Sequence, residues 1–148
     1  MRKRAERYAV WLFAAMAIVL SLVLLNACAA PTPNPFRLAN TKWTLTGMTQ
    51  NGVSQPIVPQ APTLEFQTDT LGGNAGCNNY GGDYRTQGEM IQVSALRSTL
   101  MACADEKAMA QESAYLDALQ NARMFEVRDN VLKITYGDGK GQLVFVRA

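Results

Sequence analysis

The sequence predicts a mainly β protein, built from an antiparallel sheet with one buried face and a single helix. The first observation is that apolar and polar residues alternate in short runs bounded by turn residues, which is typical of such a sheet. The residues that share a face are Trp43 and Leu45, Leu64 and Phe66, Phe125 and Val127, Leu132 with Ile134 and Tyr136, and Leu143 and Phe145. The second is that helical spacing occurs in one stretch only, from Asp105 to about Gln120. We expect this helix to lie across an open end or one face of the sheet.

The connections between the strands are marked by their turn residues. Residues 51–62 contain three prolines, so we expect a loop there with at most an edge strand. Asp129-Asn130 predicts a two-residue turn between two strands, and Asp138-Gly139 lies in the next connection. The carboxyl half is therefore predicted to be a meander.

The predicted helix is amphipathic. Its apolar side is expected to consist of Ala108, Met109, Tyr115, Leu116 and Leu119. Asp105 and Glu106 lie near its positive end, and Asn121 is a plausible stop.

Residues 72–82 hold five of the eleven glycines, with Tyr80 and Tyr84 nearby. Glycine at this density allows bulges and close approach between backbones. A phosphate-binding loop is the alternative, but Gly73 and Gly76 are followed neither by Gly-Lys-Ser/Thr nor by a helical pattern. The sequence therefore favours a bulged, tightly packed β-hairpin.

Two motifs carry a family resemblance. They are Gly73-x-x-Gly76-Cys77-Asn78-x-Tyr80-x-Gly82-x-Tyr84 and Ser98-Thr99-x-Met101-Ala102-Cys103, with further matches at Trp43-x-Leu45 and Glu112-x-x-Tyr115-Leu116-x-x-Leu119. Together they resemble the META/HslJ domain family over about residue 36 to the C-terminus. The pair Gly81-Gly82 makes the turn richer in glycine than the family pattern.

The resemblance implies a META/HslJ-like domain over 38–148, in which the meander sheet curls into a small lipocalin-like barrel with the helix packed across it. It makes Gly73, Gly76, Asn78, Tyr80, Gly82, Tyr84 and Met101 family-motif positions. The family includes heat-inducible bacterial lipoproteins linked to stress and antibiotic tolerance. It supplies no catalytic residue to carry over.

The N-terminal segment has the parts of an export signal. Four basic residues and one acid precede an apolar run from Tyr8 to Leu25, and the run ends in Leu25-Asn26-Ala27-Cys28. These four residues resemble the bacterial lipobox, which predicts a signal peptide over 1–27 and lipid attachment at Cys28. The alternative is an uncleaved transmembrane anchor, because some 18 apolar residues nearly cover a hydrocarbon core of about 30 Å. In either case the rest of the chain is exported to the cell envelope.

Residues 28–37 are rich in proline and predict an extended tether.

The charge balance of the exported part limits its partners. Removal of Arg2, Lys3, Arg4, Arg7 and Glu6 leaves 10 basic and 11 acidic residues, with no basic cluster. We therefore expect a membrane partner through acylated Cys28, and no nucleic acid.

Cys77 and Cys103 form an even pair once Cys28 is acylated, and disulfides persist in exported proteins. A bridge between them would close a loop of about 27 residues and contribute roughly 3 to 4 kcal/mol in the chain-entropy model. Two buried free thiols are the alternative.

The residue types present exclude several chemistries. Histidine is absent, which removes Ser-His-Asp and Cys-His nucleophiles and His-ligated zinc. Glu65, Asp69, Asp83 and Glu89 are predicted to be solvated surface acids, and Asp138-Gly139-Lys140-Gly141 lacks most ligands of a calcium loop. We therefore expect no catalytic residue, no cofactor and no metal, so the protein is predicted not to be an enzyme.

Glu112 is a separate case, because it lies at the edge of the predicted apolar side of the helix. We expect it to accept a hydrogen bond from the sheet beneath, in a structural rather than a catalytic role.

Two functions remain. One is a non-enzymatic envelope lipoprotein, related to stress or antibiotic tolerance, that binds another envelope protein. The other is a carrier of lipocalin type for a small hydrophobic ligand, since barrels of about eight strands can hold one small ligand. The inward side chains are large and should nearly fill a small barrel, whereas a continuous cavity would favour the carrier.

Overall fold

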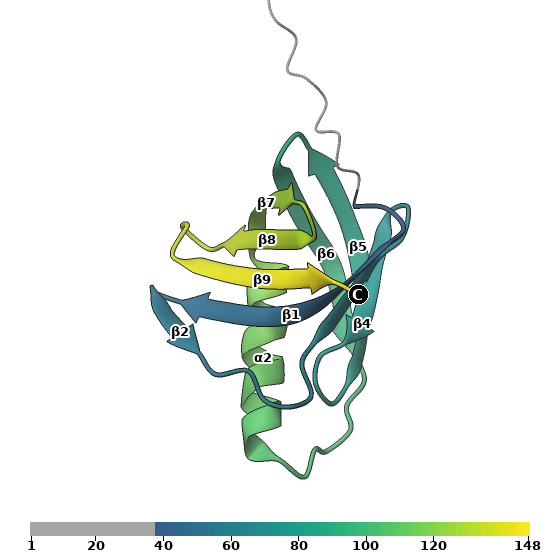
Figure 1. Cartoon of the computed structure of the whole chain (residues 1–148). Coiled ribbons are helices and arrows are strands. Elements are labelled where there is room, and N and C mark those ends of the chain that lie inside the picture. The colour runs from purple at the N-terminus through teal and green to yellow at the C-terminus, as the bar shows by residue number, and fades with distance from the viewer. Residues whose placement is uncertain (1–37) are drawn as a thin grey trace, which may run out of the picture. The chain divides into compact units, whose positions relative to one another are not determined.

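A computed structural model describes residues 38–148 of the 148-residue chain. The predicted signal peptide, Cys28 and the tether over 28–37 lie outside the described residues. The described part contains nine strands and one helix (Figure 1). They are β1 (Thr41–Gln50), β2 (Val53–Gln55), β3 (Thr63–Phe66), β4 (Thr70–Asn74), β5 (Asn79–Gln87), β6 (Met90–Ser98), α2 (Glu106–Gln120), β7 (Ala122–Arg128), β8 (Val131–Tyr136) and β9 (Gly141–Arg147).

The strands form a closed antiparallel barrel. Their order is β2-β1-β3-β4-β5-β6-β7-β8-β9, and β9 also pairs with β1, so that eight strands close on themselves while β2 extends one end of β1. Helix α2 crosses behind β1 and β9 in the view of Figure 1 and contacts β6 and β9. This arrangement confirms the predicted mainly β barrel with one helix packed across it.

The helix also covers the weakest junction of the barrel. Strands β6 and β7 share the residue pair Met90 and Met124, and the Phe125 N–H donates to the Glu89 carbonyl at 2.8 Å. Along the rest of β6, Gln120 at the end of α2 donates from Nε2 to the Val93 carbonyl at 3.1 Å. The helix thus supplies a hydrogen bond to a part of β6 that β7 does not reach.

The period-two pattern correctly predicts the inward face of the sheet. All the residues paired by that pattern are at most 9% exposed. They belong to one buried cluster, which also contains Tyr80, Tyr84 and Tyr115. Large side chains therefore fill the barrel, and their burial is the main source of its stability.

The predicted turns are confirmed. Asp129-Asn130 connects β7 to β8 with Arg128 paired to Val131, and Asp129 has a positive φ of 52°. Asp138-Gly139 lies between β8 and β9. The proline-rich segment 51–62 contains only the three-residue strand β2, as an edge strand on β1.

The glycine-rich stretch forms the bulged hairpin of β4 and β5. The pairing of β5 with β6 shifts register between Gly81 and Asp83, which marks a bulge. A Cβ on Gly73 would collide with the backbone carbonyl of Thr63, and one on Gly82 would lie 2.8 Å from the Ser94 carbonyl oxygen. Backbones therefore approach too closely here for any side chain.

Helix α2 begins and ends where predicted, but part of its predicted apolar side is wrong. Asp105 caps it by accepting the Lys107 N–H at 2.8 Å, and Asn121 follows its last residue. Met109 is 42% exposed, while Gln111 and Glu112 are buried. The helix is rotated toward these polar side chains because the barrel offers them backbone N–H donors.

Candidate functional site

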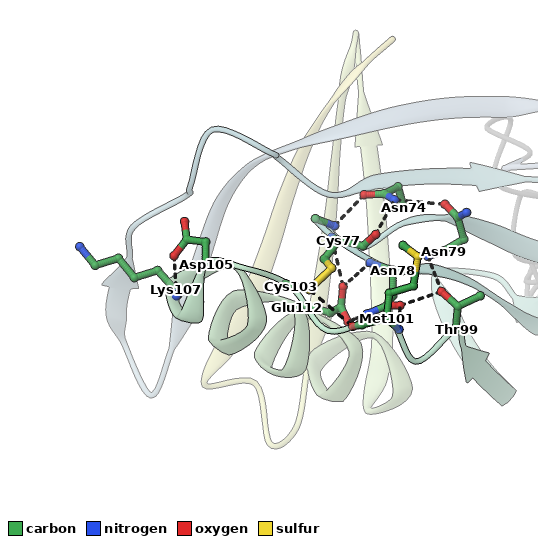
Figure 2. The surroundings of a disulfide bond; sticks show 11 residues. Asn74, Cys77, Asn78, Asn79, Thr99, Met101, Cys103, Asp105, Lys107 and Glu112 are labelled. Carbon is green, nitrogen blue, oxygen red and sulfur yellow. Dashed lines mark hydrogen bonds between the residues drawn. A yellow bond between two sulfur atoms is a disulfide. The ribbon is translucent and has the colours of Figure 1, made fainter.

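The carboxylate of Glu112 on α2 accepts three hydrogen bonds at the turn between β4 and β5 (Figure 2). Its Oε2 accepts the backbone N–H groups of Cys77 at 3.2 Å and Asn78 at 2.7 Å, and its Oε1 accepts Nδ2 of Asn78 at 2.8 Å. Three donors thus converge on one carboxylate that is only 9% exposed. Hydrogen bonds to a charged acceptor are stronger than neutral ones, so the helix is firmly attached to the turn between β4 and β5.

Asn78 extends this attachment to the loop that precedes α2. Its Oδ1 accepts the Thr99 hydroxyl at 2.8 Å and the Met101 N–H at 2.7 Å. Its Nδ2 also donates to the Met101 carbonyl at 3.2 Å. Asn78 is 4% exposed, and its side chain makes hydrogen bonds through both its oxygen and its nitrogen (Figure 2). A short side chain between two loops fixes both of them.

A disulfide between Cys77 and Cys103 joins the same two segments, with the Cα atoms 6.1 Å apart. The structure therefore contains the bond that the sequence predicts, and the alternative of two free thiols is not observed. Figure 2 shows the disulfide beside Glu112 and Asn78. We call the group formed by Cys77, Asn78, Cys103 and Glu112 the brace.

The chemistry of the brace suits a structural role. Ligand atoms of Cys77, Cys103 and Glu112 lie within 4.8 Å of one another, a spacing that could hold a metal ion. Cysteine binds metals as the thiolate, however, and both sulfur atoms are consumed by the disulfide. Both oxygens of Glu112 already accept hydrogen bonds from N–H groups. The brace therefore cross-links the β4–β5 turn, the 99–104 loop and the helix.

The family-motif positions surround this brace. Gly76 has a φ of +117°, and its N–H donates to Oδ1 of Asn74 at 2.9 Å. Met101 is 60% exposed and contacts Asn78 through its backbone N–H and carbonyl. At this motif position the contact is therefore made by the main chain of Met101 and not by its side chain.

The two tyrosines of the motif pack inside the barrel. Tyr84 donates to the Gln67 carbonyl at 2.8 Å, and its ring meets Phe66 edge-on at 4.9 Å between centroids. Tyr80 donates to the Thr63 carbonyl at 2.8 Å, and its hydroxyl lies 2.6 Å from that of Tyr115. Burial raises the pKa of both Tyr80 and Tyr115, which favours their neutral forms.

The predicted surface acids do not join the brace. Glu65 forms an exposed ion pair with Lys42 at 3.1 Å. Asp69 and Asp83 line an open polar depression of about 510 Å³ together with Arg85. Glu89 is exposed in the turn before β6.

An open groove of about 700 Å³, which no sequence motif predicts, lies between α2 and the segment after β2. It is lined by Met48, Gln50, Gln55, Pro56, Val58, Pro59, Asp105, Lys107, Ala110, Gln111 and Ala114. We call it the α2 groove. Its signal in the sequence is faint: Lys107, Ala110, Gln111 and Ala114 recur at helical spacing. Pro56 and Pro59 line the facing side of the groove. In the part of the chain that the structure describes, no helix is both long and apolar enough to cross a bilayer.

Comparisons with solved structures support the fold. The chain is similar to a protein from Burkholderia xenovorans solved by NMR, with 25% identity, a TM-score of 0.65, and coverage of 83% of this chain and 96% of that one. A second NMR structure shares 18% identity with a TM-score of 0.55, covering 72% and 88% of the two chains. A crystal structure of a DUF4847 family protein from Bacteroides vulgatus shares 14% identity with a TM-score of 0.57, covering 74% and 93%. The last two likenesses concern the fold alone.

The sequence itself decides the family. None of the curated proteins compared with the chain is a match. The family model described as the META domain matches residues 36–148, which include every residue of the barrel, the helix and the brace. The chain therefore belongs to the META domain family.

Proposed function

We propose that this protein is an exported lipoprotein, anchored to a membrane through acylated Cys28, whose META domain binds another component of the bacterial cell envelope without catalysing a reaction. The observation that carries the proposal is the disulfide between Cys77 and Cys103. Such bonds persist in oxidising compartments outside the cytoplasm. Export is also what the N-terminal signal and the lipobox-like residues before Cys28 predict.

The filled barrel supports binding at the outer surface. Lipocalin-type carriers hold their ligand among the inward side chains of the barrel. Here ten large inward side chains, Trp43, Leu45, Leu64, Phe66, Phe125, Leu132, Ile134, Tyr136, Leu143 and Phe145, belong to a single buried cluster. The envelope partner is therefore proposed to meet the outside of the domain.

Processing at Cys28 tests the anchoring. Intact-mass analysis of the protein from bacterial envelopes should show a chain that starts at Cys28 and carries added lipid, because a multiply acylated terminus anchors stably. The Cys28→Ser variant should keep residues 1–27 and lose the lipid mass. A wild-type mature species that retains residues 1–27 would instead establish the transmembrane anchor.

Stress or antibiotic tolerance is the physiological role that the family resemblance suggests. A strain lacking the protein should survive heat or antibiotic exposure less well, and the wild-type gene should restore survival. Restoration by the Cys28→Ser variant to the same level would show that anchoring is dispensable for this role.

A further inference from the structure

The two sulfur atoms of the brace and the carboxylate of Glu112 come together from three segments of the chain (Figure 2). Cys77 lies in the turn between β4 and β5, Cys103 in the loop before α2, and Glu112 on the helix. One ligand atom from each of these residues lies within 4.8 Å of the other two. In the sequence the two cysteines are 26 residues apart and have no third ligand near them, whereas the fold places Glu112 beside both.

The two cysteines are free thiols in one form of every chain, before the disulfide is made. Thiols stay reduced in the cytosol, where the chain is synthesised, and disulfides form after export. The same form returns when an external dithiol reduces the bond. Two electrons then pass to the sulfur atoms of Cys77 and Cys103, which take up two protons, while the external dithiol becomes a disulfide. In this dithiol form both cysteines can bind a metal ion as thiolates.

The carboxylate of Glu112 is already oriented for a metal ion. Its Oε2 accepts the two backbone N–H groups of Cys77 and Asn78. Among the described residues, its Oε1 accepts a hydrogen bond only from Nδ2 of Asn78. An ionised carboxylate oxygen has about two acceptor sites, so Oε1 keeps one for a further partner. Carboxylates that bind metal ions are themselves held by hydrogen bonds of this kind.

The spacing of the three ligand atoms suits a tetrahedral zinc site. With Zn–S of about 2.3 Å and Zn–O of about 2.1 Å, two sulfur ligands lie roughly 3.8 Å apart, and a sulfur and an oxygen roughly 3.6 Å apart. The three atoms here lie within 4.8 Å of one another. Once the disulfide is reduced, small rotations of the side chains therefore bring them to these separations. Cys77 and Cys103 are half-buried, so an ion can enter from solvent.

We propose that the dithiol form of the brace binds one Zn²⁺ ion through Sγ of Cys77, Sγ of Cys103 and Oε1 of Glu112, with water as the fourth ligand. The two thiols release their protons as the ion takes up both thiolates. The ion then joins the β4–β5 turn, the 99–104 loop and α2 in place of the disulfide. The brace thus has two alternative cross-links, a covalent bond when oxidised and a zinc ion when reduced. The proposal goes beyond the proposed function and does not depend on processing at Cys28.

This site departs from the expectation of no metal that the sequence supports. That expectation rests on the absence of histidine and on two cysteines that are far apart in the chain. The third ligand comes from a helix that the fold places against the β4–β5 turn. Such a ligand set is visible only in the tertiary structure.

Metal titration of residues 34–148 tests the proposal. Asn34–Ala148 form a compact unit that contains the whole buried cluster and omits the thiol of Cys28. The domain is reduced with a phosphine, which is then removed under nitrogen, and Co²⁺ is added as a coloured substitute for Zn²⁺. One Co²⁺ per domain should bind with a thiolate-to-cobalt charge-transfer absorption, and Zn²⁺ should displace it.

The oxidised domain is the matched control for this titration. It should bind either ion at least about a hundredfold more weakly, because a disulfide offers no thiolate. Equal binding by the two forms, or no binding by the dithiol form, would overturn the proposal.

Proton release and thermal stability give two further measurements. At about pH 7 the addition of Zn²⁺ should release nearly two protons per dithiol domain, since a free thiol has a pKa of about 8.5. Zn²⁺ should also raise the thermal midpoint of the dithiol domain, and a chelator should reverse this rise. The oxidised domain should show neither effect. A dithiol domain that binds Zn²⁺ without any rise in its midpoint would mean that the ion does not join the folded segments.

X-ray absorption of the zinc complex identifies the ligands without any substitution. It should show two sulfur atoms at about 2.3 Å and two oxygen atoms at about 2.0 to 2.2 Å. Four sulfur atoms per ion would mean that two domains share the zinc, and would overturn the assignment of Glu112.

Matched variants test the carboxylate. Glu112→Gln should weaken Zn²⁺ binding by more than about tenfold and keep the charge-transfer absorption of Co²⁺, because zinc prefers a carboxylate to an amide and both thiolates remain. Glu106→Gln, an exposed position in the first turn of α2, should leave the affinity unchanged. Equal affinities of Glu112→Gln and wild type would exclude Glu112 as a ligand. If Glu112→Gln does not fold when reduced, the ligand count from X-ray absorption of the wild type decides the question.

Discussion

At the scale of single residues, Glu112 shows how a charged side chain can be buried in a structural role. Burial of a carboxylate is costly unless hydrogen bonds satisfy it. Glu112 meets this condition with three N–H donors from two residues of one turn. The donors are available because the β4–β5 turn leaves the backbone N–H groups of Cys77 and Asn78 without a partner in the sheet.

Replacement of this carboxylate by an amide should be costly. Glu112→Gln is expected to lower the unfolding free energy by about 2 to 4 kcal/mol, measured by urea denaturation, because the Gln Nε2 would face an N–H donor instead of accepting one. Reorientation of Asn78 could relieve this clash only by giving up its bonds to Thr99 and Met101.

Glu106→Gln is the control, since Glu106 lies exposed in the first turn of the same helix. This variant should lower the unfolding free energy by less than about 1 kcal/mol, which is the usual effect of a charge near the helix dipole. Similar losses in the two variants would mean that the bonds of Glu112 contribute little to stability.

At the scale of elements, the disulfide connects two loops that have little packing of their own. Cys77 lies in the turn between two strands rich in glycine, and Cys103 lies in the loop between β6 and α2. The Asn78 bonds to Met101 connect the same segments without a covalent link. The start of the helix is therefore attached to the barrel twice.

Loss of the disulfide should destabilise the domain substantially. Cys103→Ser is expected to lower the unfolding free energy by roughly 2 to 5 kcal/mol, the usual cost in a small exported domain. Cys77→Ser should cost about the same, and the double variant little more than either single one, because both remove one shared bond. Fully additive losses, or two titratable thiols in the denatured, non-reduced wild type, would show that the cysteines act only as packing.

At the scale of the whole molecule, the helix and the barrel meet in a buried pair of tyrosines. Tyr80 on β5 donates to the Thr63 carbonyl, so the bond between the two hydroxyls is donated by Tyr115 on α2. The ring of Tyr115 also packs edge-on against the ring of Phe145 on β9, with the ring centroids 6.3 Å apart. Helix, β5 and β9 are thus joined at one point in the core.

This pair makes stability sensitive to alkaline pH. Burial raises the pKa of Tyr80 and Tyr115 above the ordinary value of 10, so the unfolded state releases these protons first. The two protonated tyrosines contribute fully to the free energy of unfolding below about pH 10. Above this pH their contribution declines by about 1.4 kcal/mol per pH unit for each buried tyrosine.

Tyr115→Phe should make the unfolding free energy fall less steeply with pH above about pH 10, because one of the two titrating tyrosines is removed. At pH 7 the variant should be less stable by only about 0.5 to 1.5 kcal/mol, the usual effect of one lost hydrogen bond. Urea denaturation at pH values from 9 upward measures both. An unchanged slope in the variant would show that Tyr115 does not couple folding to alkaline pH.

Features that depend on neighbours along the chain can be predicted from the amino-acid sequence. Alternation of Leu132, Ile134 and Tyr136 identifies a strand and its inward face, because successive side chains of a strand point to opposite sides. Asp105 and Asn121 mark the ends of the helix through their local hydrogen bonds. The disulfide partners followed from counting, since only Cys77 and Cys103 lie in the domain.

The buried side of the helix, in contrast, depends on contacts between segments that are distant in the sequence. Spacing alone favoured Met109 as a core residue, yet it is exposed while Gln111 and Glu112 are buried. The partners that make this burial possible, the N–H groups of Val58, Cys77 and Asn78, are more than thirty residues away in sequence. The α2 groove arises in the same way, from the helix facing the 55–59 segment. A periodic pattern reports that one side of a helix is apolar, but the polar groups it meets across the fold set its final rotation.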